Sequence, residues 1–147
     1  MTRRNLTWLL PLLSALPFPA EDADVAPRDA QVFRFSGLPA HTNADGNVMR
    51  PVLKGEIPTG EYIEVHETTL APGKMPHPPH RHKHTELMLL RTGRLELILD
   101  GKTDHLDPGD IAWCASDQLH GLKNTGPEPA NYFVIAIGPD LRPASRG

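Results

Sequence analysis

Histidine is concentrated in one short segment of this chain. The protein has eight histidines, as many as its phenylalanines, tyrosines and tryptophans together. Residues 80–86 read His-Arg-His-Lys-His-Thr-Glu, and a further histidine, His120, lies far along the chain. On a strand, His80 and His82 point to the same side, because successive side chains alternate between faces. Together with Glu86 and His120 they make three imidazoles and one carboxylate, a set that suits a first-row divalent metal.

This ligand set predicts a catalytic rather than a structural metal site. A six-coordinate ion held by four protein ligands keeps two positions open, and open positions are typical of catalytic centres. The imidazoles leave the charge of the ion unchanged and the single carboxylate removes one unit, so the ion remains a Lewis acid. We therefore expect one divalent transition metal, with Fe, Mn, Ni and Zn left open, held by His80, His82, Glu86 and His120.

The elements that must position these residues are predicted to be short strands. The 147 residues include 16 prolines and 12 glycines, about a fifth of the chain, and this disfavours long helices. Asp100-Gly101 favours a two-residue type I′ hairpin and Pro108-Gly109 a type II turn. Roughly eight strands predict one all-β sandwich or barrel. The expected strands are Val32–Phe35, Glu61–Leu70, two pieces within His80–Arg91, Leu95–Leu99, Thr103–Leu106, Ile111–Cys114, Leu119–Lys123 and Asn131–Ile137.

Charge and cysteine content exclude several classes of protein. The formal net charge of −3 gives no basic surface for nucleic acid, and the basic cluster of Arg81 and Lys83 is too small to follow a phosphate backbone. Cys114 is the only cysteine, so the chain forms no internal disulfide. It lies in an apolar strand-like run, which favours a small buried core residue over a reactive thiol.

The N-terminus differs in composition from the rest of the chain. Residues 1–20 combine a basic start, a mostly apolar stretch and a small residue before Glu21-Asp22, as in a secretory signal. Arg3-Arg4 also resembles a twin-arginine export signal. The apolar stretch is too short to span a membrane. We expect a signal peptide over 1–20, a linker over 21–30, a β domain over 31–138 and a tail over 139–147. The protein is then periplasmic or secreted; a disordered tail on a cytoplasmic protein is the alternative.

Two stretches of the sequence resemble the two motifs of the cupin superfamily. The first comprises Gly73, His80, His82, Glu86 and Gly93. The second comprises Gly109, His120 and Asn124, with Ala115 and Asp117 standing where the family has proline and glycine. The resemblance covers about residues 31–137 and implies a single cupin-type jelly-roll β-barrel. It also implies that His80, His82, Glu86 and His120 are the metal ligands, and it allows a homodimer joined through sheet edges, with Val32–Phe35 crossing to the partner.

Three functions are consistent with this resemblance. The first is a metal-dependent dioxygenase acting on a small oxygenated molecule, in which Glu86 also serves as the catalytic base. The second is a lyase or isomerase, which needs a further proton-transfer group; Met88 stands two residues after Glu86, so no phenol is offered there. The third is a non-enzymatic ligand-binding cupin. Tyr62 and Tyr132 favour packing over proton donation, and His66 is a candidate pocket residue. His84 is expected behind the ligands or at the rim of the site rather than among the ligands.

Overall fold

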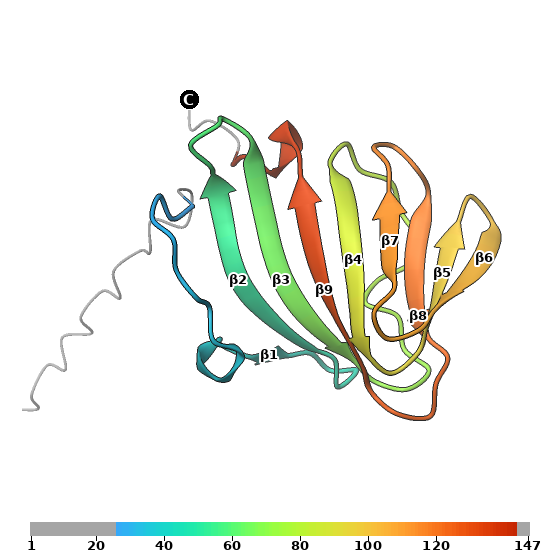
Figure 1. Cartoon of the computed structure of the whole chain (residues 1–147). Coiled ribbons are helices and arrows are strands. Elements are labelled where there is room, and N and C mark those ends of the chain that lie inside the picture. Colours follow the sequence, from blue (N-terminus) through green and yellow to red (C-terminus); the bar gives the residue numbers. More distant parts are fainter. Residues whose placement is uncertain (1–25, 144–147) are drawn as a thin grey trace, which may run out of the picture.

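The computed structural model describes residues 26–143 and consists of short antiparallel strands. Nine strands and two 3₁₀ helices lie in this part of the chain (Figure 1). In chain order they are η1 (Phe35–Gly37), β1 (His41–Thr42), β2 (Val48–Glu56), β3 (Tyr62–Leu70), β4 (Thr85–Thr92), β5 (Leu95–Leu99), β6 (Lys102–Leu106), β7 (Ile111–Cys114), β8 (His120–Asn124), β9 (Ala130–Ile137) and η2 (Pro139–Leu141).

The strands form two sheets. The larger sheet has the order β1-β2-β3-β9-β4-β7, and the smaller has the order β6-β5-β8. All pairings are antiparallel, and β9 is inserted between β3 and β4 although it comes last in the chain. The larger sheet curves, and the smaller sheet lies beside its β4–β7 end (Figure 1). The expected all-β fold of cupin jelly-roll type is confirmed, as two sheets that are not closed into one hydrogen-bonded barrel.

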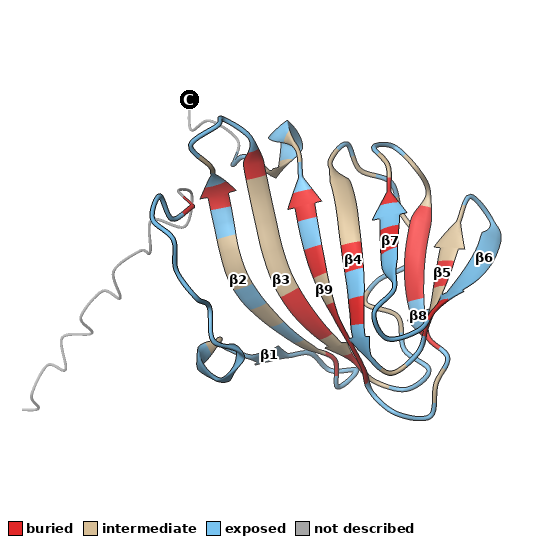
Figure 2. Ribbon diagram, viewed as in Figure 1, coloured by how far each residue is buried: buried red, intermediate tan, exposed pale blue. Residues whose placement is uncertain are grey.

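The register of the larger sheet separates an inner from an outer face. On the inner face, His66 pairs with Val134, which pairs with Met88. One residue away, Val65 and Ile135 belong to the outer face. Buried and exposed positions alternate along β9 and β7, as Figure 2 shows. The core lies between the two sheets and includes Leu70, Met88, Leu90, Leu95, Leu97, Leu106, Leu122, Tyr132 and Val134.

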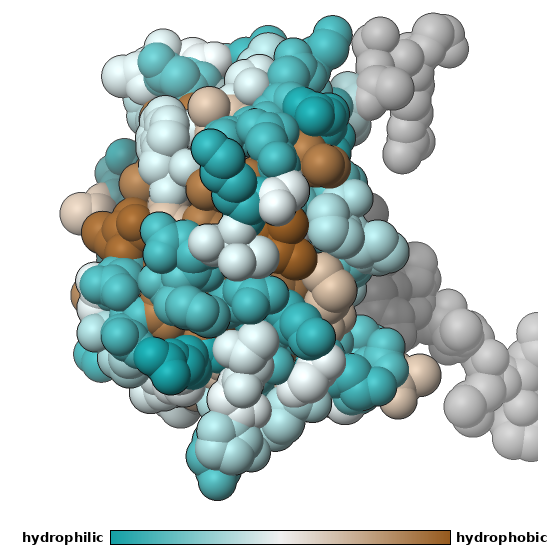
Figure 3. Space-filling model, turned by 90° about the vertical axis from the view of Figure 1, so that its right-hand side faces the viewer, coloured by the Kyte–Doolittle hydropathy of each residue, from teal (hydrophilic) through white to brown (hydrophobic). Residues whose placement is uncertain are grey.

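The smaller sheet and β7 leave a hollow between them that is lined by both apolar and polar side chains. β6 and β7 are edge strands of different sheets, and the side chains between them include Leu97, Leu99, Leu106, Ile111 and Trp113. Figure 3 looks onto this side of the molecule and shows apolar surface across the middle of it. The hollow therefore lies where the two sheets do not pair.

Two turns follow the backbone chemistry of their residues. Asp100 and Gly101 both have positive φ, 47° and 81°, as the predicted type I′ hairpin between β5 and β6 requires. Asp117, which occupies a glycine position of the second cupin motif, has a φ of 61°. Aspartate tolerates this left-handed region better than most residues, so the departure from glycine preserves the turn.

The sequence predictions differ from the structure at the N-terminal side. The expected strand Val32–Phe35 is wrong: Val32 and Phe33 lie in irregular chain, and Phe35 begins η1. β2 was not predicted, because Pro51 and Gly55 interrupt any alternating pattern there. The predicted signal peptide, residues 1–20, lies outside the described residues. Within residues 26–143, no helix is long and apolar enough to cross a membrane.

Gly93, between β4 and β5, is predicted to be indispensable for stability. Its φ is +87°, and an added Cβ would lie 2.6 Å from the Cα of Ala130. Gly46 provides a matched control, since its φ is +80° but nothing lies within 4 Å of an added Cβ. Strain alone makes Gly46→Ala cost about 1 kcal/mol, whereas Gly93→Ala should cost at least about 3 kcal/mol because backbone must move as well. Urea unfolding of both variants measures the difference, and equal losses would contradict this account of the packing.

Candidate metal centre

A pair of backbone hydrogen bonds brings the distant histidine of the sequence to the histidine-rich segment. The N–H of His80 donates to the carbonyl of His120 at 2.9 Å, and the N–H of His120 donates to the carbonyl of His80 at 3.0 Å. His120 begins β8 of the smaller sheet, while His80 precedes β4 of the larger one. The imidazole centroids of His80 and His82 lie 5.0 and 4.6 Å from that of His120. The three predicted histidines therefore come together from both sheets.

Two of these imidazoles are oriented by main-chain carbonyls. Nδ1 of His82 lies 2.9 Å from the carbonyl of His84, and Nδ1 of His120 lies 2.9 Å from the carbonyl of Gln118. A carbonyl only accepts, so each Nδ1 carries the proton and each Nε2 is left with a lone pair. This is how proteins orient histidine ligands of metals.

The fit to a metal ion rests on buried nitrogen atoms that the protein leaves without hydrogen bonds. Nε2 of His82, Nε2 of His120 and Nδ1 of His80 are all buried in this way. Unpaired buried polar atoms are rare, because each loses its hydration without compensation. The ring nitrogens that His80, His82 and His120 offer lie within 4.8 Å of one another, close enough for one ion. The residues present fit a divalent metal.

Glu86 supplies the carboxylate of the group. It lies on the inner face of β4, with Oε1 3.3 Å from Nε2 of His82 and Oε2 3.3 Å from Nε2 of His120. Burial would raise the pKa of Glu86, but the contact with His120 and the charges of His82 and His84 outweigh it and lower the pKa to about 2. Glu86 is therefore a carboxylate at neutral pH, the form that binds metals.

The same contacts act on the histidines in opposite directions. The Glu86 carboxylate raises the pKa of His120, partly opposed by burial. Burial lowers the pKa of His80, and the nearby His77, His120 and His82 lower it further. A lowered pKa favours the neutral imidazole, which is the form that binds a metal.

His84 and Asp140 form a second contact to Glu86 that the sequence did not reveal. The imidazole of His84 stacks on that of His82 at 3.5 Å, and its Nε2 lies 3.3 Å from Oε1 of Glu86. Asp140, on η2, receives both the backbone N–H and Nδ1 of His84, at 3.1 and 2.9 Å. Gly138 permits this approach, since an added Cβ would lie 2.6 Å from Cβ of His84. His84, predicted to lie behind the ligands or at the rim, contacts one oxygen of Glu86 while His120 contacts the other.

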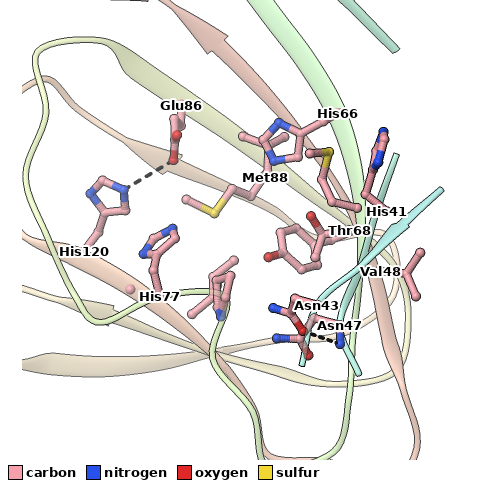
Figure 4. A pocket seen from close by; sticks show the side chains of 16 residues that line it. His41, Asn43, Asn47, Val48, His66, Thr68, His77, Glu86, Met88 and His120 are labelled. Atoms are coloured by element: carbon pink, nitrogen blue, oxygen red, sulfur yellow. Dashed lines mark hydrogen bonds and ion pairs between the residues drawn. The ribbon is translucent and has the colours of Figure 1, made fainter. Parts of the chain in front are cut away.

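A cavity of about 280 Å³ opens between the sheets next to this group. Glu86 and His120 line it, and His66 and Met88 extend into it from β3 and β4 (Figure 4). The prediction that His66 lines a pocket is thus confirmed. The remaining lining residues are His41, Asn43, Asn47, Val48, Met49, Thr68, Pro76, His77, Gly121, Leu122, Tyr132 and Val134.

Tyr132 contributes a phenol to the cavity wall. The side chain is buried, and this burial raises the pKa of its hydroxyl, an effect that a hydrogen bond with Thr68 partly offsets. Tyr132 and Thr68 are paired across β9 and β3, which places both on the inner face. The β-periodicity of residues 131–137 could have indicated this position, but only the strand order shows which face is enclosed.

The comparisons with known proteins agree with this fold. The sequence model of the Cupin domain family matches residues 66–136. No curated protein sequence matches the chain significantly. Among solved structures, an RmlC-like cupin from Shewanella frigidimarina is 15% identical, with a TM-score of 0.61 over 82% of this chain and 97% of that one. The polyketide cyclase RemF from Streptomyces resistomycificus is 16% identical, with a TM-score of 0.59 over 74% of this chain and 80% of that one.

A third similar structure is a predicted oxalate decarboxylase from Thermotoga maritima. It is 19% identical, with a TM-score of 0.57 over 73% of this chain and 98% of that one. Two antiparallel sheets, the matching family model and the histidine-rich site together define the class: this chain belongs to the cupin superfamily. At these identities the three structures establish the fold alone.

We predict that the purified full chain binds one divalent transition metal ion, and that binding depends on the bridged histidines. His80→Ala should weaken zinc binding by more than about 100-fold, since losing even a residue behind a ligand costs roughly 10- to 100-fold. His105→Ala is the matched control, because His105 is exposed on β6 and distant in the fold from the site. Metal analysis measures the number of ions bound per chain, and competition with a chromophoric chelator measures the zinc affinity of the wild type and of both variants. Equal zinc affinity in the two variants would rule out this site.

Proposed function

We propose that this cupin is a metal-dependent enzyme, a dioxygenase that acts on a small oxygenated molecule bound in the cavity between the sheets. The observation that carries the proposal is the convergence of three imidazoles beside the Glu86 carboxylate, with Glu86 and His120 of this group lining the cavity. His80, His82, Glu86 and His120 would hold one divalent ion. When bound, the ion supplies Lewis acidity and, if it is redox-active, a route for reaction with O₂.

Glu86 is the residue to which we assign the proton-transfer step. It is a carboxylate that lines the cavity, and it can accept the proton of a substrate hydroxyl whose pKa a bound metal would lower. The proton then resides on a Glu86 oxygen while the substrate becomes an enolate or catecholate. In a dioxygenase both oxygen atoms of O₂ enter the product, so no external reductant is required.

The chain's other cavity residues support this role by position. His84, which Asp140 orients, contacts the Glu86 oxygen that His120 does not contact. Met88 follows Glu86 by two residues on β4, so both side chains lie on the inner face. Met88 is buried and lines the cavity beside Glu86. An apolar neighbour excludes water from the space in which the enolate forms.

A lyase or isomerase is the second candidate, and Tyr132 is the observation that favours it. Such reactions need a proton donor near the polarised carbonyl. The raised pKa of Tyr132 keeps its phenol protonated at neutral pH, and the residue lines the same cavity as Glu86. Two of the similar structures are a polyketide cyclase and a predicted oxalate decarboxylase, and one fold commonly hosts reactions of several classes.

Oxygen consumption distinguishes the candidates. We expect the iron-, manganese- or nickel-loaded protein to consume O₂ with at least one member of a panel of flavonols, catechols and diketones. Glu86→Gln should lower the rate at least about 100-fold, as expected for loss of a general base. His105→Ala should keep the wild-type rate. Measurements use an oxygen electrode and product analysis.

Each contrary outcome points to another function. Anaerobic conversion of a panel member, lost in Tyr132→Phe, would replace the dioxygenase with the lyase or isomerase. Binding without conversion, under aerobic and anaerobic conditions alike, would make the protein a non-enzymatic ligand-binding cupin.

We also propose that two copies of the chain associate through the outer face of the larger sheet. One row of paired residues crosses five strands of this face and is entirely apolar: Leu53, Val65, Ile135, Leu87 and Trp113. Trp113 is 59% exposed, and five strands make the row roughly 20 Å wide. Large exposed apolar patches are uncommon on monomers, and in a two-fold dimer the same patch of both copies forms the interface.

Light scattering after size exclusion tests this association. The wild-type chain should elute as a dimer and Trp113→Glu as a monomer, because the new charge would be buried without a partner. Thr103→Glu, on the exposed strand β6, is the control and should remain dimeric. A monomeric wild-type protein at micromolar concentration would refute the proposal.

A further inference from the structure

The cavity beside the candidate metal centre contains no lysine or arginine. Sixteen side chains of the described residues line it, and Glu86 is the only carboxylate among them. Four of the others are histidines, which, unlike lysine and arginine, carry no permanent positive charge. Apart from a metal, this part of the chain supplies no permanent positive charge to a ligand in the cavity.

Two cations of β2, the strand that pairs with β3, are held in ion pairs with acids. Lys54, in the same pairing row as Ala136 and Glu86, is 2.8 Å from Glu64. Arg50 lies on the outer face, where its guanidinium is 2.8 Å from the buried carboxylate of Glu67. Turning either cation toward the cavity would leave its acid unpaired.

At the end of the cavity near β1, Lys74 is likewise engaged. Its ammonium group is 2.8 Å from the carboxylate of Asp45 in the turn before β2. Asn43 and Asn47, which line the cavity from this turn, are themselves neutral. Oδ1 of Asn43 accepts two backbone N–H groups, and Oδ1 of Asn47 accepts the N–H of Ala71. These amide oxygens hold the turn rather than a ligand.

The wall between the metal centre and this turn is mainly apolar. Met88, Val134 and Leu122 contribute to it from the two sheets, and Met49 and Val48 continue it toward the far end. The uncharged polar groups of Thr68 and Tyr132 and the imidazole of His66 lie among them. Figure 4 shows Glu86 and His120 at one side of the cavity and Asn43, Asn47 and Val48 at the other. A ligand that reaches from one end to the other lies against this apolar wall.

From this charge distribution we infer that the substrate carries a single metal-binding oxygen group and an otherwise uncharged, largely apolar body. Phosphorylated and polycarboxylated molecules are excluded, because a second anionic group would lose its hydration opposite no cation. The inference rests on the proposed function only in assigning the metal-binding group. The charge preference of the cavity itself follows from its lining residues.

Three hydroxamates that share one metal-binding group test the inference. Benzohydroxamate and 4-methylbenzohydroxamate are uncharged away from the hydroxamate, whereas 4-carboxybenzohydroxamate carries a second anion. Isothermal titration of the zinc-loaded full chain at pH 8 should give Kd values at least tenfold higher for the carboxylated probe than for the methylated one. Equal or tighter binding of the carboxylated probe would overturn the inference.

A charge placed on the wall should reverse this preference. Met49 lines the cavity and is 41% exposed, so a polar replacement is tolerated there. Met49→Lys should tighten binding of 4-carboxybenzohydroxamate at least fivefold and change that of 4-methylbenzohydroxamate less than twofold. Met49→Gln introduces a side chain of similar length without a charge, and it should leave the binding of both probes unchanged. Failure of the lysine to discriminate between the probes, with the fold intact by circular dichroism, would contradict the inference.

A comparison on the metal-free chain separates this inference from the proposed function. In the chelator-treated protein, 2-naphthol should bind at least tenfold more tightly than 2-naphthyl phosphate, since the cavity then presents only the Glu86 carboxylate. If the chain binds no zinc, the proposed metal-dependent function fails and this comparison alone decides the inference. Tighter binding of the phosphate than of the alcohol would refute it whatever the metal content.

Discussion

The reciprocal backbone hydrogen bonds between His80 and His120 are the constraint on which the rest of the candidate site depends. They join residues 40 positions apart and link the smaller sheet to the segment that enters β4. His120 belongs to the smaller sheet, whereas Glu86 lies on β4 of the larger sheet and His82 lies in the segment that precedes β4. These hydrogen bonds hold the two groups of residues together. Because backbone pairing fixes the spacing, the imidazoles meet within reach of one ion before any ion is present.

Charge balance around Glu86 is the second feature that shapes the site. A buried carboxylate is costly unless nearby groups compensate it. Here His82, His84 and His120 surround it, and Asp140 orients His84. The thiol of Cys114 lies across from Glu86 in the β4–β7 pairing, and burial together with the Glu86 charge raises its pKa to about 11. It therefore remains protonated, in agreement with the prediction of an inert core cysteine.

Much of the fold and the candidate ligand set could be predicted from the sequence, because both depend on local patterns. The hairpin at Asp100-Gly101 follows from residues that tolerate positive φ, and β7 is the predicted Ile111–Cys114. The spacing of His80, His82 and Glu86 identified a group that the fold brings together with His120. The run Val32–Phe35 was wrongly predicted as a strand, because a short run with strand-forming residues becomes a strand only where the edge of a sheet is available to pair with it.

Long-range contacts could not be predicted in the same way. Nothing in the sequence indicates that Asp140 of η2 reaches His84, because that contact follows from the insertion of β9 between β3 and β4. The sequence also does not indicate which face of β3 is enclosed, since His66 and Glu67 are neighbours in the chain yet lie on opposite faces. The charge character of the cavity emerges only when segments as distant as Asn43 and Tyr132 line the same space.

The most direct measurement of the central claim is the X-ray absorption spectrum of the zinc-loaded protein. We predict three imidazole ligands with oxygen from Glu86, no sulfur scattering, and the loss of one imidazole in His120→Ala. His66→Ala, which alters the cavity but not the candidate ligand set, should leave the spectrum unchanged. A sulfur ligand at about 2.3 Å, or an imidazole count that His120→Ala does not change, would contradict a metal centre built from the bridged histidines.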